Sequence, residues 1–178
     1  MRPLVIDCSP RVGGNSDIIV SHIGALFDVD IVYMRELEYA FCNGCETCTE
    51  THRCVHDDSA TALYENILER DTVIFVSPVY FYSFDGHTKG FIDRAQYLWS
   101  REKSMDRTRS LYLIGVGGQD FEDNFTPMER TMTCLAYTLG ARYKGGLFFR
   151  GIDNAGDIDT DIHMHSIDDF LANITRRV

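Results

Sequence analysis

Residues 72–94 read TVIFVSPVYFYSFDGHTKGFIDR, and this stretch decides the fold. Residues 73–76 form a short, uninterrupted apolar run, which is typical of a strand that is buried on both faces of a parallel sheet. Pro78 ends this strand, and an aromatic-rich turn follows it. From about Gly86 onward, apolar residues recur at the spacing of one helix face. The stretch therefore predicts a strand, a turn and a helix in succession, the unit from which parallel α/β sheets are built.

The same alternation of strand and helix patterns runs through the whole chain. Further strands are predicted by short apolar runs at residues 4–6, 31–33, 111–116 and 146–149. For the last two helices we expect a capping box of Thr126 with Glu129, and a cap at Ser166. Because strands and helices alternate without internal repeats, we predict one α/β domain over residues 1–178, whose parallel sheet carries helices on both faces. Functional groups then belong at the carboxyl ends of the strands.

Composition and charge limit the classes of function. The chain has 178 residues, with 17 Lys and Arg against 27 Asp and Glu, and a formal net charge of −10. Such a charge repels phosphate backbones and anionic lipid, which argues against nucleic-acid and membrane partners. The N-terminus lacks the apolar core of a secretory signal, and no apolar stretch reaches the ~18 residues of a membrane span. We therefore expect a cytoplasmic protein, in which thiols are kept reduced.

Residues 8–16, CSPRVGGNS, join the first predicted strand to the first predicted helix. Adjacent glycines let the backbone curl and a helix N-terminus attracts an anion, so the segment predicts a phosphate-binding loop, with a plain tight turn as the alternative. It contains neither Gly-Lys-Ser/Thr nor GxGxxG, which excludes a Walker A loop and a dinucleotide fingerprint. A tyrosine phosphatase would need Arg six residues after Cys8, where Gly14 stands. We therefore expect Cys8 to be a small residue packed at a strand end.

Four of the six cysteines lie in a loop at residues 41–56, at positions 42, 45, 48 and 54. In a cytoplasmic protein, this spacing indicates a metal or redox chemistry more than disulfides. Three thiolates at three-residue spacing, with a fourth on a short extension, are able to hold an iron–sulfur cube. Zinc also accepts four sulfurs, although its usual format is two C-x2-C pairs separated by a longer loop. On the residues alone, a cluster, zinc, disulfides and free thiols all remain open.

Two other patterns resemble metal sites but are not predicted to bind a metal. A run of aspartates that starts at Asp157 mimics a calcium loop, but Ile162 stands where the turn glycine must be. His163 and His165 are two residues apart, and in an extended segment they would point to opposite sides. The separate Cys134 is expected to be a core residue at the edge of a buried helix face.

Three segments, in the right order, resemble a known family: the flavodoxin-like NAD(P)H-dependent FMN reductases, and within them the iron–sulfur flavoproteins. These segments are SPRVGGNS at residues 9–16, SPVYFYSFDGHTKGFIDR at residues 77–94, and the glycine-containing residues 115–120. The spacing C-x2-C-x2-C-x5-C, ending in Cys-Val-His-Asp-Asp, resembles the cysteine loop of the iron–sulfur flavoproteins. The chain departs from the family pattern at Cys8, where Gly is usual, and at Ser59, where Met often follows Asp-Asp.

The resemblance implies a flavodoxin-like, five-stranded parallel sheet in the order 2-1-3-4-5, and it assigns roles to residues. The FMN phosphate is assigned to the first segment: Ser9, Arg11, Gly14, Asn15 and Ser16. The flavin ring is assigned to two turns: Pro78, Val79, Tyr80, Phe81 and Tyr82 on one side, and Gly117 and Gly118 on the other. A [4Fe-4S] cluster near the flavin is assigned to the thiolates of Cys42, Cys45, Cys48 and Cys54.

The expected function is that of an FMN-dependent oxidoreductase, which moves electrons between NAD(P)H or a reduced carrier and an acceptor. If the cluster is present, it would pass single electrons to a carrier such as ferredoxin. Because the flavin carries the chemistry, we expect no side chain to act as a general acid or base. The resemblance also implies a homodimer or homotetramer. The alternatives are a non-enzymatic flavin and iron–sulfur electron carrier, and a zinc-stabilised binding module.

Overall fold

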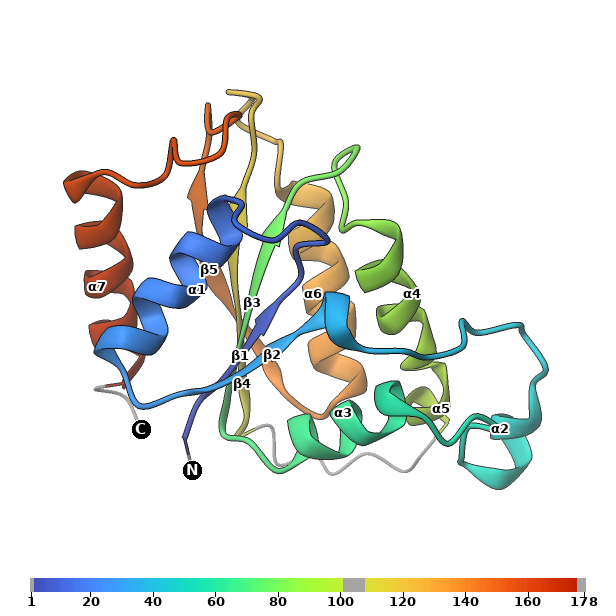
Figure 1. The fold of residues 1–178 in the computed structure, drawn as a ribbon. Coiled ribbons are helices and arrows are strands. Elements are labelled where there is room, and N and C mark those ends of the chain that lie inside the picture. The colour runs from blue at the N-terminus through green and yellow to red at the C-terminus, as the bar shows by residue number, and fades with distance from the viewer. Residues whose placement is uncertain (1, 101–107, 176–178) are drawn as a thin grey trace.

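A five-stranded parallel sheet forms the centre of the computed structural model, which describes residues 2–100 and 108–175 (Figure 1). The strands lie in the order β2-β1-β3-β4-β5, which confirms the predicted flavodoxin-like topology. Their bounds are β1 (Leu4–Asp7), β2 (Asp30–Tyr33), β3 (Thr72–Pro78), β4 (Ser110–Val116) and β5 (Arg142–Phe149). The helices are α1 (Asn15–Leu26), α2 (Thr47–Thr51), α3 (Ser59–Leu68), α4 (Gly86–Arg94), α5 (Gln96–Trp99), α6 (Thr126–Thr138) and α7 (Asp161–Thr175), with a 3-10 turn η1 at Met34–Glu36.

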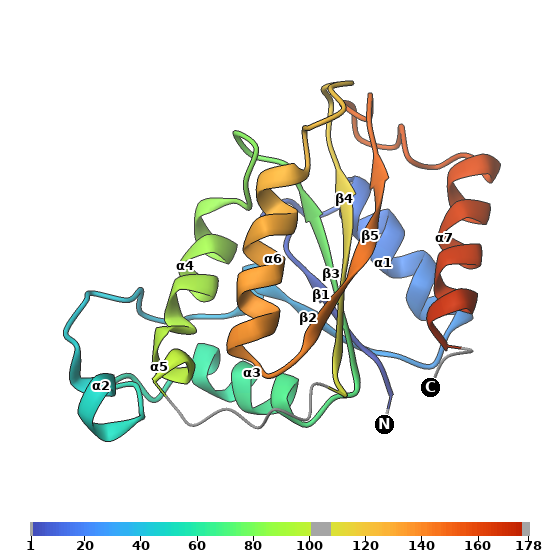
Figure 2. The ribbon, with the colours of Figure 1, turned by 180° about the vertical axis from the view of Figure 1, so that it is seen from behind.

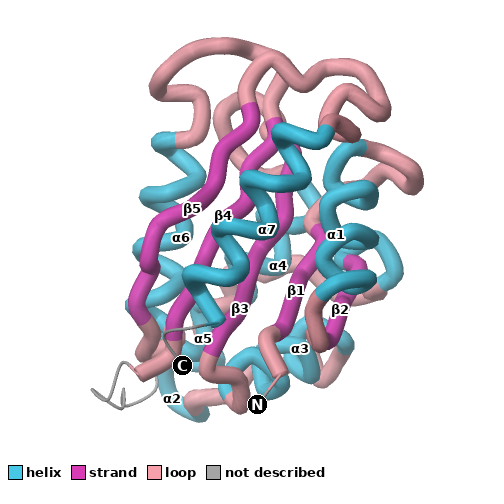
Figure 3. Tube along the Cα trace, turned by 90° about the vertical axis from the view of Figure 1, so that its left-hand side faces the viewer, coloured by secondary structure: helices cyan, strands magenta, loops and turns pink. Residues whose placement is uncertain are grey.

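Two hydrophobic cores lie on the two faces of the sheet, because successive residues of each strand point to opposite faces. Leu4 and Ile6 pack with α3, α4, α5 and α6 on one face. Val5, between them, packs with α1 and α7 on the other face. Figure 2 shows the first layer of helices and Figure 3 shows α1 and α7 over the sheet. Burial on both faces explains why the strand sequences read as continuous apolar runs.

Two predicted helix caps are wrong. Helix α6 begins at Thr126 after Phe125 without a capping side chain, and Glu129 instead accepts a hydrogen bond from the Tyr143 hydroxyl, at 2.9 Å. Helix α7 begins at Asp161, so Ser166 lies inside it. Both capping residues were inferred from local spacing, whereas in the structure Glu129 is held by Tyr143 and the Ser166 hydroxyl donates to the Ile162 carbonyl within α7, at 2.9 Å.

The carboxyl ends of the strands carry the loops that position the candidate site. The β1–α1, β3–α4, β4–α6 and β5–α7 loops gather at this edge, whereas the cysteine loop at residues 41–56 projects beyond α4 and α5 (Figures 1 and 2). Within the described ranges, no helix has the length and apolar character needed to cross a membrane.

Candidate functional site

The loop after β1 curls into the start of α1, as the glycine-rich sequence predicts. Gly13 has φ 70°, in the left-handed region that favours glycine. Gly14 is the N-cap of α1, and in the described structure no side chain caps this helix. In contrast, α3 and α4 are capped by Asp58 and Asp85. The first turn of α1 therefore presents backbone N–H groups at the carboxyl edge of the sheet, where they are available to an anion.

The side chains of this loop differ in what they are free to bind. The Ser9 hydroxyl bonds to the backbone N–H and C=O of Arg11, which fixes the bend, and the Arg11 residue itself is exposed. The Asn15 amide is already used, since it donates to the Asn154 carbonyl at 2.9 Å and accepts from the N–H of Gly156. The predicted phosphate contact of Asn15 is therefore restricted to its backbone.

A network of buried charges supports the loop from below. Asp7, whose side chain is fully buried, accepts hydrogen bonds from the Ser9 N–H at 2.9 Å and from the Arg35 guanidinium at 2.6 Å. Arg35 also pairs with Asp17 at 2.9 Å, and Asp17 accepts the Gly13 N–H at 2.6 Å. One guanidinium thus ties the start of the loop to its end. Sequence reasoning missed this network because its members come from three separate elements.

Burial raises the pKa of Asp7 to about 6 from its ordinary value of 3.8, and the nearby Asp17 carboxylate adds to the rise although Ser9 and Arg35 oppose it. A raised acid pKa stabilises the fold below pH ~4, and this contribution is lost as the pH rises through about 6. We expect FMN-free protein to lose about 2 kcal/mol of unfolding free energy between pH 4.5 and 7.5, because about 1.4 units of the pKa shift fall in this window, at 1.36 kcal/mol each. Urea titrations at both pH values should show a flatter dependence for Asp7→Asn, and an equal dependence in both proteins would contradict the assignment.

The turn after β3 is strained and exposes aromatic rings. Tyr80 and Ser83 exchange two backbone hydrogen bonds of 2.9 Å, and the residues between them, Phe81 and Tyr82, have φ of 48° and 61°. Glycine or asparagine normally occupies such positions, and strain of this kind concentrates at functional sites. Phe81 is fully exposed, and Tyr80 and Tyr82 are 39% and 42% exposed. The turn therefore holds three aromatic side chains at the edge of the sheet without burying them.

The two glycines after β4 lie close to side chains of neighbouring loops. A Cβ on Gly117 would come within 2.6 Å of the Asn124 amide, and one on Gly118 would come within 2.6 Å of Asp153. A side chain on Gly117 would displace the buried Asn124 amide, whereas one on Gly118 would displace the exposed Asp153 carboxylate, which is able to move. The backbone groups of Gly117 are both used within the fold, since its N–H donates to the Phe149 carbonyl at 2.9 Å and its carbonyl accepts the Ile152 N–H at 3.1 Å.

A cavity of about 290 Å³ opens beside the phosphate loop, between Ser9, Arg35 and the start of α4. Asp85 lines it and uses one carboxylate oxygen to cap α4, while its buried Oδ2 has no hydrogen-bond partner among the described residues. Cys8 also lines the cavity, but it is only 1% exposed, and burial raises the pKa of its thiol. The prediction that Cys8 is a packed residue is confirmed.

The four cysteines of the loop line one cavity, of about 150 Å³, together with Arg94 and Tyr97. All six cysteines of the chain are free thiols, so the structure forms none of the disulfides left open above. Backbone and side-chain hydrogen bonds from Thr47 lower the pKa of Cys45, whereas burial raises that of Cys48. Among the described residues, no three His, Cys, Asp or Glu side chains converge on a single metal-ion position. The thiols therefore surround a space instead of meeting at one point.

The cysteine cavity and the phosphate loop lie at opposite ends of α4. Asp85 caps the helix next to Cys8, and Arg94, its last residue, lines the cysteine cavity. A helix of nine residues is about 14 Å long. The family resemblance implied a cluster near the flavin, whereas the single chain separates the two positions by the length of this helix.

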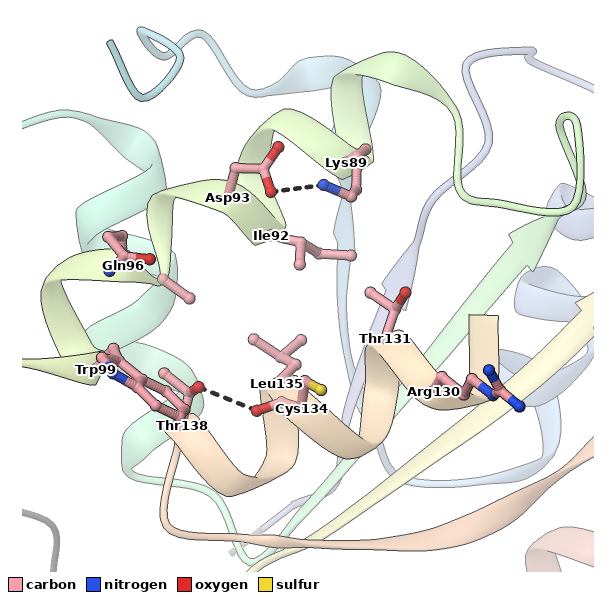
Figure 4. Close-up of a pocket in the computed structure, with 11 residues that line it drawn as sticks. Lys89, Ile92, Asp93, Gln96, Trp99, Arg130, Thr131, Cys134, Leu135 and Thr138 are labelled. Atoms are coloured by element: carbon pink, nitrogen blue, oxygen red, sulfur yellow. Dashed lines mark hydrogen bonds and ion pairs between the residues drawn. The ribbon is translucent and has the colours of Figure 1, made fainter. Parts of the chain in front are cut away.

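A further groove, of about 400 Å³, lies between α4–α5 and α6 (Figure 4). Cys134 lines it and is exposed, so the prediction that this residue is in the core is wrong. It falls outside the buried stripe of α6 that contains Met128, Met132 and Leu135. His163 and His165 lie in α7 and not in an extended segment, and the His163 ring packs against Phe149.

Comparison with known proteins agrees with this geometry. A Bacillus subtilis protein, YwqN, whose name assigns it to the NAD(P)H-dependent FMN-containing oxidoreductases, is 26% identical over 170 residues, which cover 90% of this chain and 91% of that protein. An iron–sulfur flavoprotein of Methanosarcina thermophila is 31% identical over 123 residues, or 66% of this chain and 64% of that protein. This chain thus matches slightly less than two thirds of that protein's length.

Solved structures and a family model complete the comparison. An FMN-dependent NADH-azoreductase from Bacillus anthracis, in complex with FMN, superposes with a TM-score of 0.68 and 12% identity, covering 98% of this chain and 99% of that chain, which supports the fold. Residues 1–145 match the family model described as NADPH-dependent FMN reductase. The chain therefore belongs to the NADPH-dependent FMN reductase family.

Proposed function

We propose that this chain binds FMN at the carboxyl edge of its sheet and moves electrons from NAD(P)H to an acceptor, with an iron–sulfur cluster in the cysteine loop as the one-electron relay. The observation that carries the proposal is the uncapped start of α1, placed by the loop of residues 8–14. A phosphate bound there would accept hydrogen bonds from the backbone N–H groups of Asn15 and Ser16. The helix dipole would further stabilise its negative charge. The exposed Arg11 would add a positive charge.

The rest of the flavin fits the groups around that loop. The strained aromatic turn would offer Tyr80 to one face of a flat ring, and the backbone of Gly117 and Gly118, just after β4, would border the opposite side. The buried and unpaired Oδ2 of Asp85 is suited to accept a hydrogen bond from a ribityl hydroxyl, which would remove the penalty of leaving that oxygen unsatisfied. Phe81, fully exposed, would then be covered by a second copy in a homodimer or homotetramer, which sedimentation of the FMN-loaded protein measures.

When bound, FMN would supply the redox chemistry, which is to accept a hydride from the nicotinamide and to release electrons one at a time. The protein's own residues bind the phosphate, stack against the ring and hold the site in shape through Asp7, Arg35 and Asp17. We propose no general acid or base among the side chains, because the flavin carries the chemistry.

The cluster is proposed over zinc because the iron–sulfur flavoprotein of Methanosarcina thermophila is similar to this chain and because the cysteine spacing is not the usual zinc format of two C-x2-C pairs separated by a longer loop. A cube instead takes one thiolate at each of its four irons, which suits thiols that surround a common cavity. We propose Cys42, Cys45, Cys48 and Cys54 as these ligands, and a one-electron carrier such as ferredoxin as the acceptor.

Gly14→Asp tests the phosphate position. The backbone of Gly14 is extended, and a Cβ there would contact only the Arg11 side chain, at 3.6 Å, so the fold tolerates the change. The new carboxylate would cap α1 and occupy the place of the phosphate. Because hydrogen bonds to charged groups contribute about 1.5–3 kcal/mol, we expect FMN to bind about 10- to 100-fold more weakly, as measured by quenching of flavin fluorescence.

Two controls separate this effect from a loss of structure. Riboflavin, which lacks the phosphate, should bind wild type and Gly14→Asp equally. Gly14→Asn caps the helix without the charge and should weaken FMN binding less than Gly14→Asp does. Undiminished FMN affinity in Gly14→Asp would refute the phosphate site, and bleaching of bound FMN by NAD(P)H distinguishes an enzyme from a carrier that needs a protein donor.

A further inference from the structure

The last residue of α4, Arg94, is among the most deeply buried charged side chains, with 2% of the residue exposed. Its two terminal nitrogens form a fork on Asp58, with Nη1–Oδ2 at 2.8 Å and Nη2–Oδ1 at 3.1 Å. A buried arginine that has a matched carboxylate is held in one orientation, because both hydrogen bonds must be kept. The guanidinium is therefore a fixed group.

The other hydrogen bonds of Arg94 close the cysteine loop at its base. Nη1 donates to the carbonyl of Ala40 at 2.6 Å, just before the loop. Nη2 donates to the carbonyl of His56 at 3.1 Å, at the end of the loop. Asp58 reinforces the closure, since its Oδ2 also accepts the Ala40 N–H at 3.1 Å. The Arg94 side chain thus links the segment that enters the cysteine loop to the segment that leaves it.

One donor of Arg94 is left over. Its Nε is buried and has no hydrogen-bond partner in the described part of the chain. Arg94 lines the same cavity as the four cysteines. Burial lowers the pKa of Arg94, whereas hydrogen bonds to Asp58 and Cys54 and the charges of both side chains raise it above its usual value, so Cys54 already lies within reach of this guanidinium. A buried N–H that stays unpaired is costly, so this donor calls for an acceptor in the cysteine cavity.

We propose that Arg94 is a positioning residue for the iron–sulfur cluster, in which Nε–H donates to a sulfur atom in the cysteine cavity while the two terminal nitrogens hold the loop closed. This inference rests on the proposed function, because it needs the cluster. One-electron reduction adds a negative charge to the cluster, and a buried hydrogen-bond donor with a positive charge stabilises that added charge. Arg94 therefore raises the reduction potential of the cluster.

Arg94→Lys tests the inference, because lysine keeps the charge but loses the Nε–H and the fork. After anaerobic reconstitution with iron and sulfide, we expect the equilibrium constant for one-electron reduction to fall at least about tenfold, or ~59 mV in the midpoint potential. The matched control is Arg53→Gln, which removes an exposed positive charge next to Cys54 and should shift the potential less than Arg94→Lys does. Unchanged FMN binding shows that each variant is folded.

If Arg94→Lys does not bind FMN, a second pair of variants decides. Asp58→Asn keeps an oxygen that can accept the Thr61 N–H and so cap α3. It removes the negative charge that offsets Arg94, so the reduction potential of the cluster should rise. Asp57→Asn removes an exposed charge one position earlier and should raise it less. Equal shifts within both pairs would overturn the inference and leave the cluster assignment standing. Wild-type protein that takes up no iron would instead refute the cluster, and this inference with it.

Discussion

Replacing Arg35 with alanine is expected to lower the free energy of unfolding of the FMN-free protein by about 3–5 kcal/mol at pH 7. The reason is the carboxylate that remains: Asp7 has no exposed side-chain surface, and Arg35 is the cation that it contacts, at 2.6 Å. Asp17 would lose its contact of 2.9 Å with the same guanidinium. Urea unfolding at pH 7 measures the loss, and the loss should be smaller at pH 4.5, where Asp7 is protonated.

The same substitution should weaken FMN binding, because Asp7 and Asp17 hold the N–H groups of Ser9 and Gly13 in the phosphate loop. The matched control is Arg2→Ala. Arg2 pairs with Asp28 at 3.0 Å, but the two side chains are 58% and 76% exposed, so this change should cost less than about 1 kcal/mol. Adding Asp7→Asn to Arg35→Ala should recover part of the stability, since it removes the unpaired charge. Equal losses of stability in Arg35→Ala and Arg2→Ala would show that Arg35 contributes no more than a surface cation does.

The features that could be predicted from the sequence are those that depend on local patterns. The strands, the curl of the phosphate loop and the grouping of four cysteines each follow from residues that are close in the chain, whereas the strand order came from the family resemblance. The aromatic turn at Tyr80 was also expected, although its left-handed backbone was not, because Phe and Tyr carry no signal for that conformation. Local patterns thus indicated the segments of the candidate site but not the contacts that support those segments.

The supports could not be predicted because their partners are far apart in sequence. Asp7 meets Arg35 across 28 residues, and Asp58 meets Arg94 across 36 residues. The Asn15 amide, assigned to the phosphate by resemblance, is bonded to Asn154, which is 139 residues away. A charged residue in a sequence carries no sign of whether it will be exposed or buried opposite a partner. The buried charges were therefore visible only in the folded chain.

Cys45→Ser is expected to abolish iron binding and to leave FMN binding unchanged. Cys45 is exposed and lines the cavity shared by the four loop cysteines, so its replacement removes one ligand without disturbing a packed core. A serine hydroxyl stays protonated at neutral pH and is a poor ligand for iron, whereas the thiolate is the ligand that a cluster needs. Iron and acid-labile sulfide, assayed after anaerobic purification, should fall from the wild-type level to background.

The chain offers a matched control in Cys134, which is also exposed but lies in the groove between α4–α5 and α6, outside the cysteine cavity. Cys134→Ser should keep the full iron content, so that loss in Cys45→Ser alone assigns the metal to the loop. Because α4 separates the loop from the phosphate site, FMN should bind both variants with wild-type affinity. Iron retained in Cys45→Ser would exclude this residue as a ligand. Stoichiometric zinc in wild-type protein would replace the relay with a structural role for the cysteine loop, and FMN would then pass its electrons directly to the acceptor.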